Sequence, residues 1–242
     1  MALKTPPTRR WQRWLIGGVV AVAVLGVGGP YLYTQLVESN NPPPLSVSPP
    51  ESAPASASAP APGPGPGPGP APSASLDGTW TVASGSQAGY RVNQNVAGQT
   101  ATTVGRTKAV TGSATVSGGQ LTAGTVSVNL AKLVTNEAER DEHVRDGILE
   151  TDQFPTAVFT LTQPAPLGTT TPGQVTQVPA IGKLTIHGVT KPATVKLAVR
   201  QSGGTLSVQG TTSIALADYG IEPPTTIAPT GQIEFLLQLT QA

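Results

Sequence analysis

The sequence contains no cysteine, and only two of its 242 residues are histidine. The lack of cysteine excludes disulfide bonds, thiolate metal sites and a cysteine nucleophile. Charged residues make up only 11% of the chain and leave a net charge of +1, which argues against a nucleic-acid partner, because such binding usually needs a clustered cationic surface. Aromatic residues are 4%, so a core would be built mostly from Val, Leu, Ile and Ala.

Motifs typical of enzymes are also missing. The chain has no Gly-x-Ser-x-Gly elbow, no phosphate-binding loop, no dinucleotide fingerprint and no His-Glu-x-x-His zinc motif. The acids Asp141, Glu142 and Asp146 could supply paired carboxylates for a surface hydrolase acting on glycosides, but acids crowded on one helix usually face water. Catalysis by these acids is therefore the least favoured interpretation, and we expect no cofactor or metal.

The N-terminal region has the pattern of a membrane-targeting segment. Four basic residues fall in the first thirteen positions, and no acid precedes Glu38. Residues 15–37 carry no charge, and a helix of about 20 residues crosses the hydrocarbon layer. Aromatic residues flank the apolar centre, as in the belts at head-group depth: Trp11, Trp14, Tyr31 and Tyr33.

This pattern predicts a single-pass protein of the cell membrane. Residues 1–14 would be a basic cytoplasmic segment and 15–37 a transmembrane signal anchor, which places the rest of the chain on the extracytoplasmic side. The alternative is a cleaved signal peptide, after which the remainder would be secreted. Both interpretations export everything after Glu38.

Residues 38–75 are dominated by Pro, Ala, Ser and Gly and include an alternating Pro-Gly run at 62–70. Such a segment has too little apolar surface to offset the entropy of ordering it, and its two-residue period is not that of collagen. We predict a disordered linker that serves as a spacer, and we favour this over a ligand for a partner that recognises proline motifs.

The remaining residues, 76–242, have the length of one domain and a dominant period of two. Apolar and polar residues alternate most clearly over 126–130, 195–199 and 233–239. This alternation is typical of strands with one buried face, and turn residues such as Gly203-Gly204 separate about eight such stretches. The pattern predicts an all-β domain, either an antiparallel barrel or a sandwich.

One segment of this domain has helical spacing instead. Asn136 and Glu139 stand at the positions of a capping box, and Val144 and Ile148 lie four residues apart on one face. We therefore predict a short helix over 137–149. Its crowded acids and arginines are typical of a solvated surface with ion pairs between near neighbours.

The function expected for this domain depends on whether the interior of the barrel is hollow or filled. An eight-stranded barrel has room for its own side chains or for one small ligand. Because aromatic residues are few, we expect space for an apolar ligand. A solid barrel that presents loops to a surface partner is the alternative, since a thin sandwich core would use the same residues.

Three stretches follow a recognisable pattern. Residues 140–145 read Arg-Asp-Glu-His-Val-Arg and lead to Phe154-Pro155. Residues 182–192 read Gly-Lys-Leu-Thr-Ile-His-Gly-Val-Thr-Lys-Pro, and 217–221 read Ala-Asp-Tyr-Gly-Ile. Together they resemble the YceI-like family, lipocalin-like proteins of the bacterial periplasm or cell surface, and the resemblance covers essentially all of 76–242.

The resemblance implies an eight-stranded antiparallel, lipocalin-like barrel with a short helix near one end. It also implies a binding protein, and not an enzyme, that holds a polyisoprenoid or quinone-like lipid in an elongated apolar cavity. One departure is Ile148-Leu149, where relatives often have an aromatic pair, and it bears on the length or identity of the ligand.

The expected ligand site needs an apolar wall and few polar groups, because burying hydrocarbon yields about 25 cal/mol per Å². The residues expected to form this wall are Tyr90, Val128, Val144, Ile148, Phe154, Phe159, Leu184, Ile186, Phe235 and Leu237. For each, membership of an ordinary core is the alternative. Arg140, Asp141 and His143 are expected to contact a polar head group at the mouth, or else to lock the helix to the barrel. His187 is expected to stabilise a turn.

Overall fold

The computed structural model describes residues 41–47, 75–96, 98–168 and 171–242. The predicted cytoplasmic segment 1–14, the predicted anchor 15–37 and most of the predicted linker lie outside these ranges. Within them, no helix combines the length and apolar character needed to cross a membrane.

The period-two stretches form strands, as predicted. Their bounds are β1 Gly78–Val82, β2 Gln87–Val96, β3 Gln99–Thr107, β4 Val110–Ser117, β5 Gln120–Asn129, β6 Thr156–Leu161, β7 Ala165–Pro166, β8 Val175–Ile186, β9 Val189–Ser202, β10 Thr205–Ala215 and β11 Ile227–Gln241. The strand register turns the alternating apolar side chains of β11 inward, which is why Phe235, Leu237 and Leu239 are buried.

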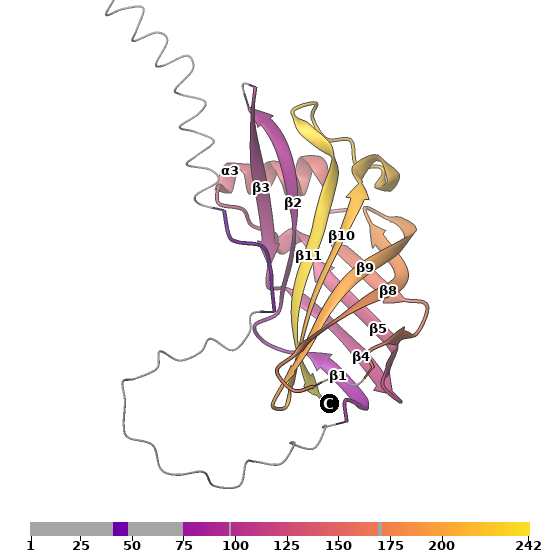
Figure 1. Ribbon diagram of the computed structural model, residues 1–242. Coiled ribbons are helices and arrows are strands. Elements are labelled where there is room, and N and C mark those ends of the chain that lie inside the picture. Colours follow the sequence, from indigo (N-terminus) through magenta and orange to yellow (C-terminus); the bar gives the residue numbers. More distant parts are fainter. Residues whose placement is uncertain (1–40, 48–74, 97, 169–170) are drawn as a thin grey trace, which may run out of the picture.

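The sheet closes into a barrel (Figure 1). Its order is β1-β4-β5-β6-β8-β9-β10-β11, and β1 also pairs with β11, so the ring of eight strands is complete. The hairpin of β2 and β3 extends the ring upward, because β2 pairs with β11 beyond the end of β1. All neighbouring pairs are antiparallel, which confirms the predicted eight-stranded antiparallel barrel.

A helical segment between β5 and β6 lies beside β3, the outer strand of the hairpin. In the described part of the chain, the outer edge of β3 pairs only through one bridge, Arg106 with Val134. The segment between β5 and β6 contains η2 (Leu130–Lys132), α3 (Ala138–Glu142) and η3 (His143–Ile148). Figure 1 shows α3 at the end of the barrel that carries the β2–β3 hairpin. We call this the helical end, and the end near β1 the closed end.

The helix differs in detail from the prediction. Its second half is a π-helical turn, in which the Leu149 amide donates to the Val144 carbonyl at 2.9 Å. The expected capping box is not formed, because Glu137 is the N-cap and makes no side-chain capping bond. Asn136 instead accepts from the Arg140 guanidinium at 2.7 Å, so its side chain is engaged with the exposed helix surface.

The buried residues form two clusters. The larger one fills the closed end and includes Trp80, which is 3% exposed and donates its indole N–H to the Leu76 carbonyl at 2.8 Å. The smaller one lies at the helical end and centres on Leu184, Ile186 and Tyr219. Packing is therefore unequal along the barrel axis.

Residues 41–47, which we call the strap, correct one sequence prediction. They fall inside the range predicted to be a disordered linker, yet they lie against the outer wall beside β3 (Figure 1). Leu45 is buried, and the barrel supplies hydrogen-bond partners to the strap backbone. Low apolar content did not prevent docking, because the partners are polar side chains.

Candidate functional site

The helical end of the barrel encloses a cavity of about 520 Å³. This volume lies within the range of about 300–1,000 Å³ that is typical of small-molecule sites. Its wall is mostly apolar and comes from β2, β5, β6, β8, β10, β11 and η3. Ten of the thirteen predicted site residues lie in this wall: Tyr90, Val128, Arg140, His143, Val144, Ile148, Phe159, Leu184, Ile186 and Phe235.

The π-helical turn forms one side of the cavity. Val144, Ile148 and Leu149 all line it, and Val144 is buried. A π-turn widens the helix locally, and such turns are often found at functional sites. Ile148 and Leu149 are therefore part of the wall.

Glycines next to aromatic rings keep the cavity open. Three rings in the wall each lie against a glycine of the neighbouring strand: Tyr90 on Gly105, Phe159 on Gly182 and Phe235 on Gly210. A Cβ added at Gly210 would stand 2.1 Å from a Phe235 ring atom, so even a methyl group there would displace the ring. The rings thus occupy the places of missing side chains along the wall, which leaves the centre of the barrel open.

The cavity ends inside the barrel. Val126, Phe159 and Phe235 line both the large cavity and a void of only about 60 Å³ on the closed-end side. Leu237, predicted as ligand wall, borders this small void and not the large cavity. The hollow is therefore a blind pocket confined to one half of the barrel.

Two of the predicted polar residues line the mouth. The Arg140 guanidinium donates to two side chains just before its helix, to the Glu137 carboxylate at 2.6 Å and to Asn136 Oδ1 at 2.7 Å. His143 lies one turn further on and is exposed. Both residues are placed to meet a polar group that enters from outside.

Asp141 does not line the cavity. Its side chain is 9% exposed, and Oδ1 accepts a hydrogen bond from the Thr135 amide at 2.6 Å. This contact fixes the start of the helical segment to the loop before it. Asp141 therefore contacts neither the cavity nor a barrel strand through this bond, and its expected roles at a head group or in locking the helix to the barrel stay predictions.

Phe154 also lies outside the cavity. Its ring packs on the His187 ring, with centroids 4.5 Å apart, and on Gly188. His187 adopts a φ of 51° in the turn between β8 and β9, and its Nε2 atom is 3.6 Å from the Glu150 carboxylate. The Phe-Pro segment thus attaches the helical connection to this turn.

Two hydroxyl groups in the cavity wall have no partner. Tyr90 Oη and Thr103 Oγ1 are buried and make no hydrogen bond to any described residue. Burial raises the pKa of Tyr90 to about 12, Arg140 opposes this shift, and Asp141 adds to it. The phenol therefore stays neutral at ordinary pH. A buried unpaired hydroxyl is costly, so a ligand with a polar atom at this depth would be favoured.

Sequence reasoning missed part of the wall. Ile221, Pro223 and Pro224 line the cavity from the connection between η4 (Leu216–Tyr219) and β11, and Ile227 lines it from the first position of β11. These residues follow no helical or strand period, so their inward position depends on how the loop folds over the mouth. Ile214 belongs to a strand whose weaker alternation did carry a signal.

Comparison with known proteins places the barrel in a family. A family model described as a YceI-like domain matches residues 80–239. A UPF0312 protein of Pseudomonas fluorescens is 38% identical over 102 residues, which are 39% of this chain and 51% of the relative. A UPF0312 protein of Pseudomonas aeruginosa is 33% identical over 122 residues, which are 47% and 59%. The chain spans about half the length of the curated relatives it matches.

Two solved structures share the fold. One is a polyisoprenoid binding domain from Saccharophagus degradans implicated in plant cell wall breakdown, with a TM-score of 0.56 and 18% identity over 67% of this chain and 98% of the other. The second is BcnA of Burkholderia cenocepacia, with a TM-score of 0.54 and 21% identity over 63% and 95%. At these identities the likeness concerns the fold.

Proposed function

This chain belongs to the YceI-like family, and we propose that its barrel binds a long-chain isoprenoid or a similar lipid in the cavity at the helical end. The observation that carries the proposal is the cavity itself, which is lined mostly by apolar side chains and ends at Phe159 and Phe235 inside the barrel. The similar structure described as a polyisoprenoid binding domain supports this choice of ligand class.

The physical basis is the burial of hydrocarbon. An isoprenoid tail has no polar atoms, and each Å² of apolar surface removed from water contributes about 25 cal/mol. The tail would enter past Arg140 and His143 and end at Phe159 and Phe235. A hydroxyl or quinone-type carbonyl on the ligand would find the Tyr90 hydroxyl as a hydrogen-bond partner.

We further infer that the barrel works outside the cytoplasm while attached to the cell membrane. The support is the charge and hydropathy pattern of residues 1–37. A cleaved signal peptide is the alternative, which would make the barrel a secreted protein. The mass of the mature N-terminus separates the two, because only a retained anchor leaves residues 15–37 on the membrane-bound chain.

Two other functions fit the geometry less well. A solid interaction module does not account for an apolar cavity with unpartnered hydroxyl groups. A hydrolase that uses the acidic cluster would need Asp141 free, yet this carboxylate accepts the Thr135 amide.

The proposal is tested by extracting the full chain with organic solvent after purification from bacterial cells, followed by mass spectrometry. We expect a polyprenyl species or a prenylquinone in the wild type. Ala157→Trp should lose it, because Ala157 lies in the cavity wall and its replacement fills the space.

Thr160→Trp is the matched control. Thr160 lies on the same strand but faces outward and is exposed, so the same ring is added without filling the cavity. We expect this variant to retain the lipid. A wild type without any lipid, or equal lipid in the Ala157→Trp variant, would contradict the proposal.

A further inference from the structure

A buried carboxylate lies on the outer wall of the barrel, away from the cavity. Glu234 of β11 is 1% exposed, although it stands on the outward register of its strand, where the neighbouring Gln232 is exposed. Val104 of β3 also faces outward and is 2% exposed. Outward residues of a barrel become buried only where something covers them, and the strap lies on Glu234, where the Leu45 amide contacts its carboxylate.

The wall beneath the strap is built across three strands. One row of paired residues crosses the three strands and contains Glu234, Gly89 and Arg106. Gly89 of β2 is the middle member, because it pairs with both of the others. A Cβ at Gly89 would lie 2.0 Å from the Gly105 carbonyl and 3.0 Å from Arg106 Cδ. The missing side chain lets Arg106 reach over β2 to Glu234, and the two groups meet at 2.7 Å.

Arg91 completes this polar cluster. Its Nε atom donates to Glu234 Oε1 at 2.9 Å, so both guanidinium groups share one carboxylate oxygen. Each guanidinium keeps further N–H groups for other acceptors. The second oxygen of Glu234 likewise stays available to a donor.

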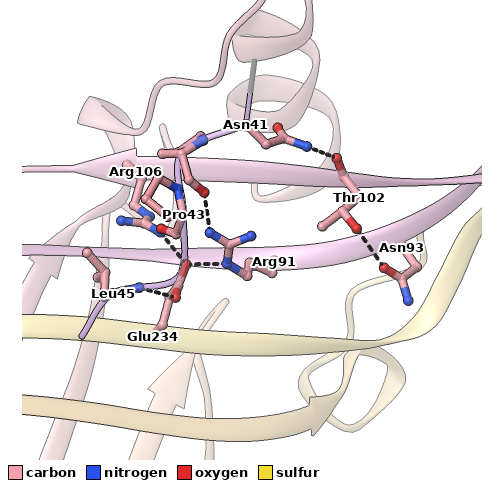
Figure 2. Close-up of polar contacts among 9 residues, drawn as sticks. Asn41, Pro43, Leu45, Arg91, Asn93, Thr102, Arg106 and Glu234 are labelled. Atoms are coloured by element: carbon pink, nitrogen blue, oxygen red, sulfur yellow. Dashed lines mark hydrogen bonds and ion pairs between the residues drawn. The ribbon is translucent and has the colours of Figure 1, made fainter. Parts of the chain in front are cut away.

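The strap supplies what this cluster lacks (Figure 2). Arg91 donates to the Pro42 carbonyl, and Arg106 donates to the Pro43 carbonyl at 2.9 Å. The Leu45 amide donates to Glu234 Oε2 at 3.1 Å. Two guanidinium donors therefore meet two carbonyls, and one carboxylate meets one amide.

The order of residues in the strap fits this arrangement. Pro42, Pro43 and Pro44 carry no N–H, so this stretch offers acceptors without competing donors. Leu45 provides the first amide after the prolines, and this amide is the one that reaches the carboxylate. Consecutive prolines also hold an extended backbone, which lowers the entropy lost on docking.

We propose that the outer wall of β2, β3 and β11 is a binding site for an extended proline-rich segment, occupied in this chain by its own residues 41–47. The occupant is recognised by carbonyls of consecutive prolines followed by one amide. The site is separate from the lipid cavity and does not depend on the proposed lipid ligand.

The site also sets where the strap begins on the barrel. The Asn41 side-chain amide donates to the Thr102 carbonyl at 2.5 Å. Thr102 pairs with Asn93 in the β2–β3 hairpin, and the residues that follow them in the chain, Thr103 and Gln94, line the cavity. The chain before Asn41 is therefore joined to the barrel at its helical end. If that chain is a membrane tether, the mouth of the cavity is held toward the membrane.

The test measures where the strap lies in the full chain. Because the sequence has no cysteine, Ser46→Cys together with Lys183→Cys gives two unique positions for spin labels. Both side chains are exposed, one on the strap and one on β8. We expect one narrow distribution of label-to-label distances, whereas a broad distribution would overturn the proposal.

Substitutions on both sides of the contact sharpen the test. Glu234→Gln removes the charge that holds both arginines, and Leu45→Pro removes the strap amide without touching the barrel. Each should broaden the distribution at least twofold. Gln232→Ala, on the same face of β11, should leave it narrow. A narrow distribution in both the Glu234→Gln and Leu45→Pro variants would contradict the assigned contacts.

A mixture of two singly labelled chains tests whether the occupant is the chain's own strap. We expect no distance signal between chains. A narrow signal in the mixture would mean that the strap comes from a second copy, which would overturn the intramolecular assignment.

A synthetic peptide with residues 39–48 tests whether the site accepts a separate proline-rich segment. An excess of this peptide should compete with the strap and broaden the distribution of the doubly labelled chain. A peptide with Pro42–Pro44 changed to alanine should do so at least tenfold less effectively.

Discussion

The two ends of the barrel are built from the same alternating strands, yet one end is solid and the other is hollow. At the closed end, Trp80 and its neighbours form a continuous core with only a small void. At the helical end, aromatic rings lie against glycines and a π-helical turn forms part of the wall, and about 520 Å³ stays open. The comparison shows that alternation of apolar and polar residues is enough to form the barrel wall. Whether the interior is filled depends on which residues face each other across neighbouring strands.

The largest expected effect is a difference in stability between the two ends. Trp80→Ala should lower the free energy of unfolding by about 3–5 kcal/mol, because it leaves a cavity in a packed core. Leu184→Ala should cost about 2 kcal/mol, since its side chain already borders open space. Urea denaturation measures both, and equal losses would mean that the two ends are packed alike.

The next effect concerns the buried phenol at the helical end. Burial raises the pKa of Tyr90 to about 12 in the folded chain, whereas an unfolded tyrosine titrates near about 10. Folding therefore favours the protonated phenol, and its contribution is fully present below about pH 10 and is lost as the pH rises toward about 12. Over this window the wild type should lose about 3 kcal/mol relative to Tyr90→Phe.

Denaturation of both proteins between about pH 9 and 12 checks this difference, because other groups that titrate there are common to the two chains. Absorbance titration of the tyrosines gives a second readout, in which the substitution should remove the phenol that ionises last. A constant stability gap across the window would show that Tyr90 is in contact with water.

A smaller effect is expected where glycine supports a ring. Gly210→Ala should push Phe235 away from the wall, cost about 1–3 kcal/mol through overpacking and reduce the amount of bound lipid. Gly204→Ala, in the turn between β9 and β10, has open space around the added methyl group and should change stability by less than about 0.5 kcal/mol. Equal stability and equal lipid content in the two variants would contradict the view that glycines beside the aromatic rings keep the cavity open.

The smallest effect separates the two roles considered for Asp141. Asp141→Asn weakens the hydrogen bond from the Thr135 amide and should cost about 1 kcal/mol, while lipid content stays unchanged. Asp146→Asn, on the same helical segment but exposed, should be neutral within about 0.5 kcal/mol. Loss of lipid in Asp141→Asn at unchanged stability would instead favour a head-group contact.

The barrel could be predicted because every strand buries one face. Apolar and polar residues therefore alternate along the sequence, and this alternation can be recognised without knowing which strands pair. Phe235 and Leu237 look identical in that pattern, yet one lines the cavity and the other borders the small void. The difference depends on register, since Phe235 faces Gly210 across the strand pair. Register is a tertiary property, so the extent of the cavity could not be deduced from the alternation.

The strap was missed for a similar reason. Glu234 stands at a polar position of an alternating strand, where an exposed side chain is the ordinary expectation. Its burial depends on Leu45 and two arginines that are distant in sequence. The prediction of a disordered linker over 38–75 used composition alone, and composition does not report on docking of a segment such as 41–47 to a surface made elsewhere in the chain.

The most direct test of a lipid-binding hollow at one end is a titration of the full chain with isoprenoid alcohols of increasing length, measured by displacement of a fluorescent apolar probe. We expect affinity to rise with each added isoprene unit until the tail reaches Phe159 and Phe235, and then to level off. The Ala157→Trp variant should lose most of this gain. Absence of saturable binding at every length, or the same length dependence in the filled variant, would contradict a hollow helical end that holds lipid.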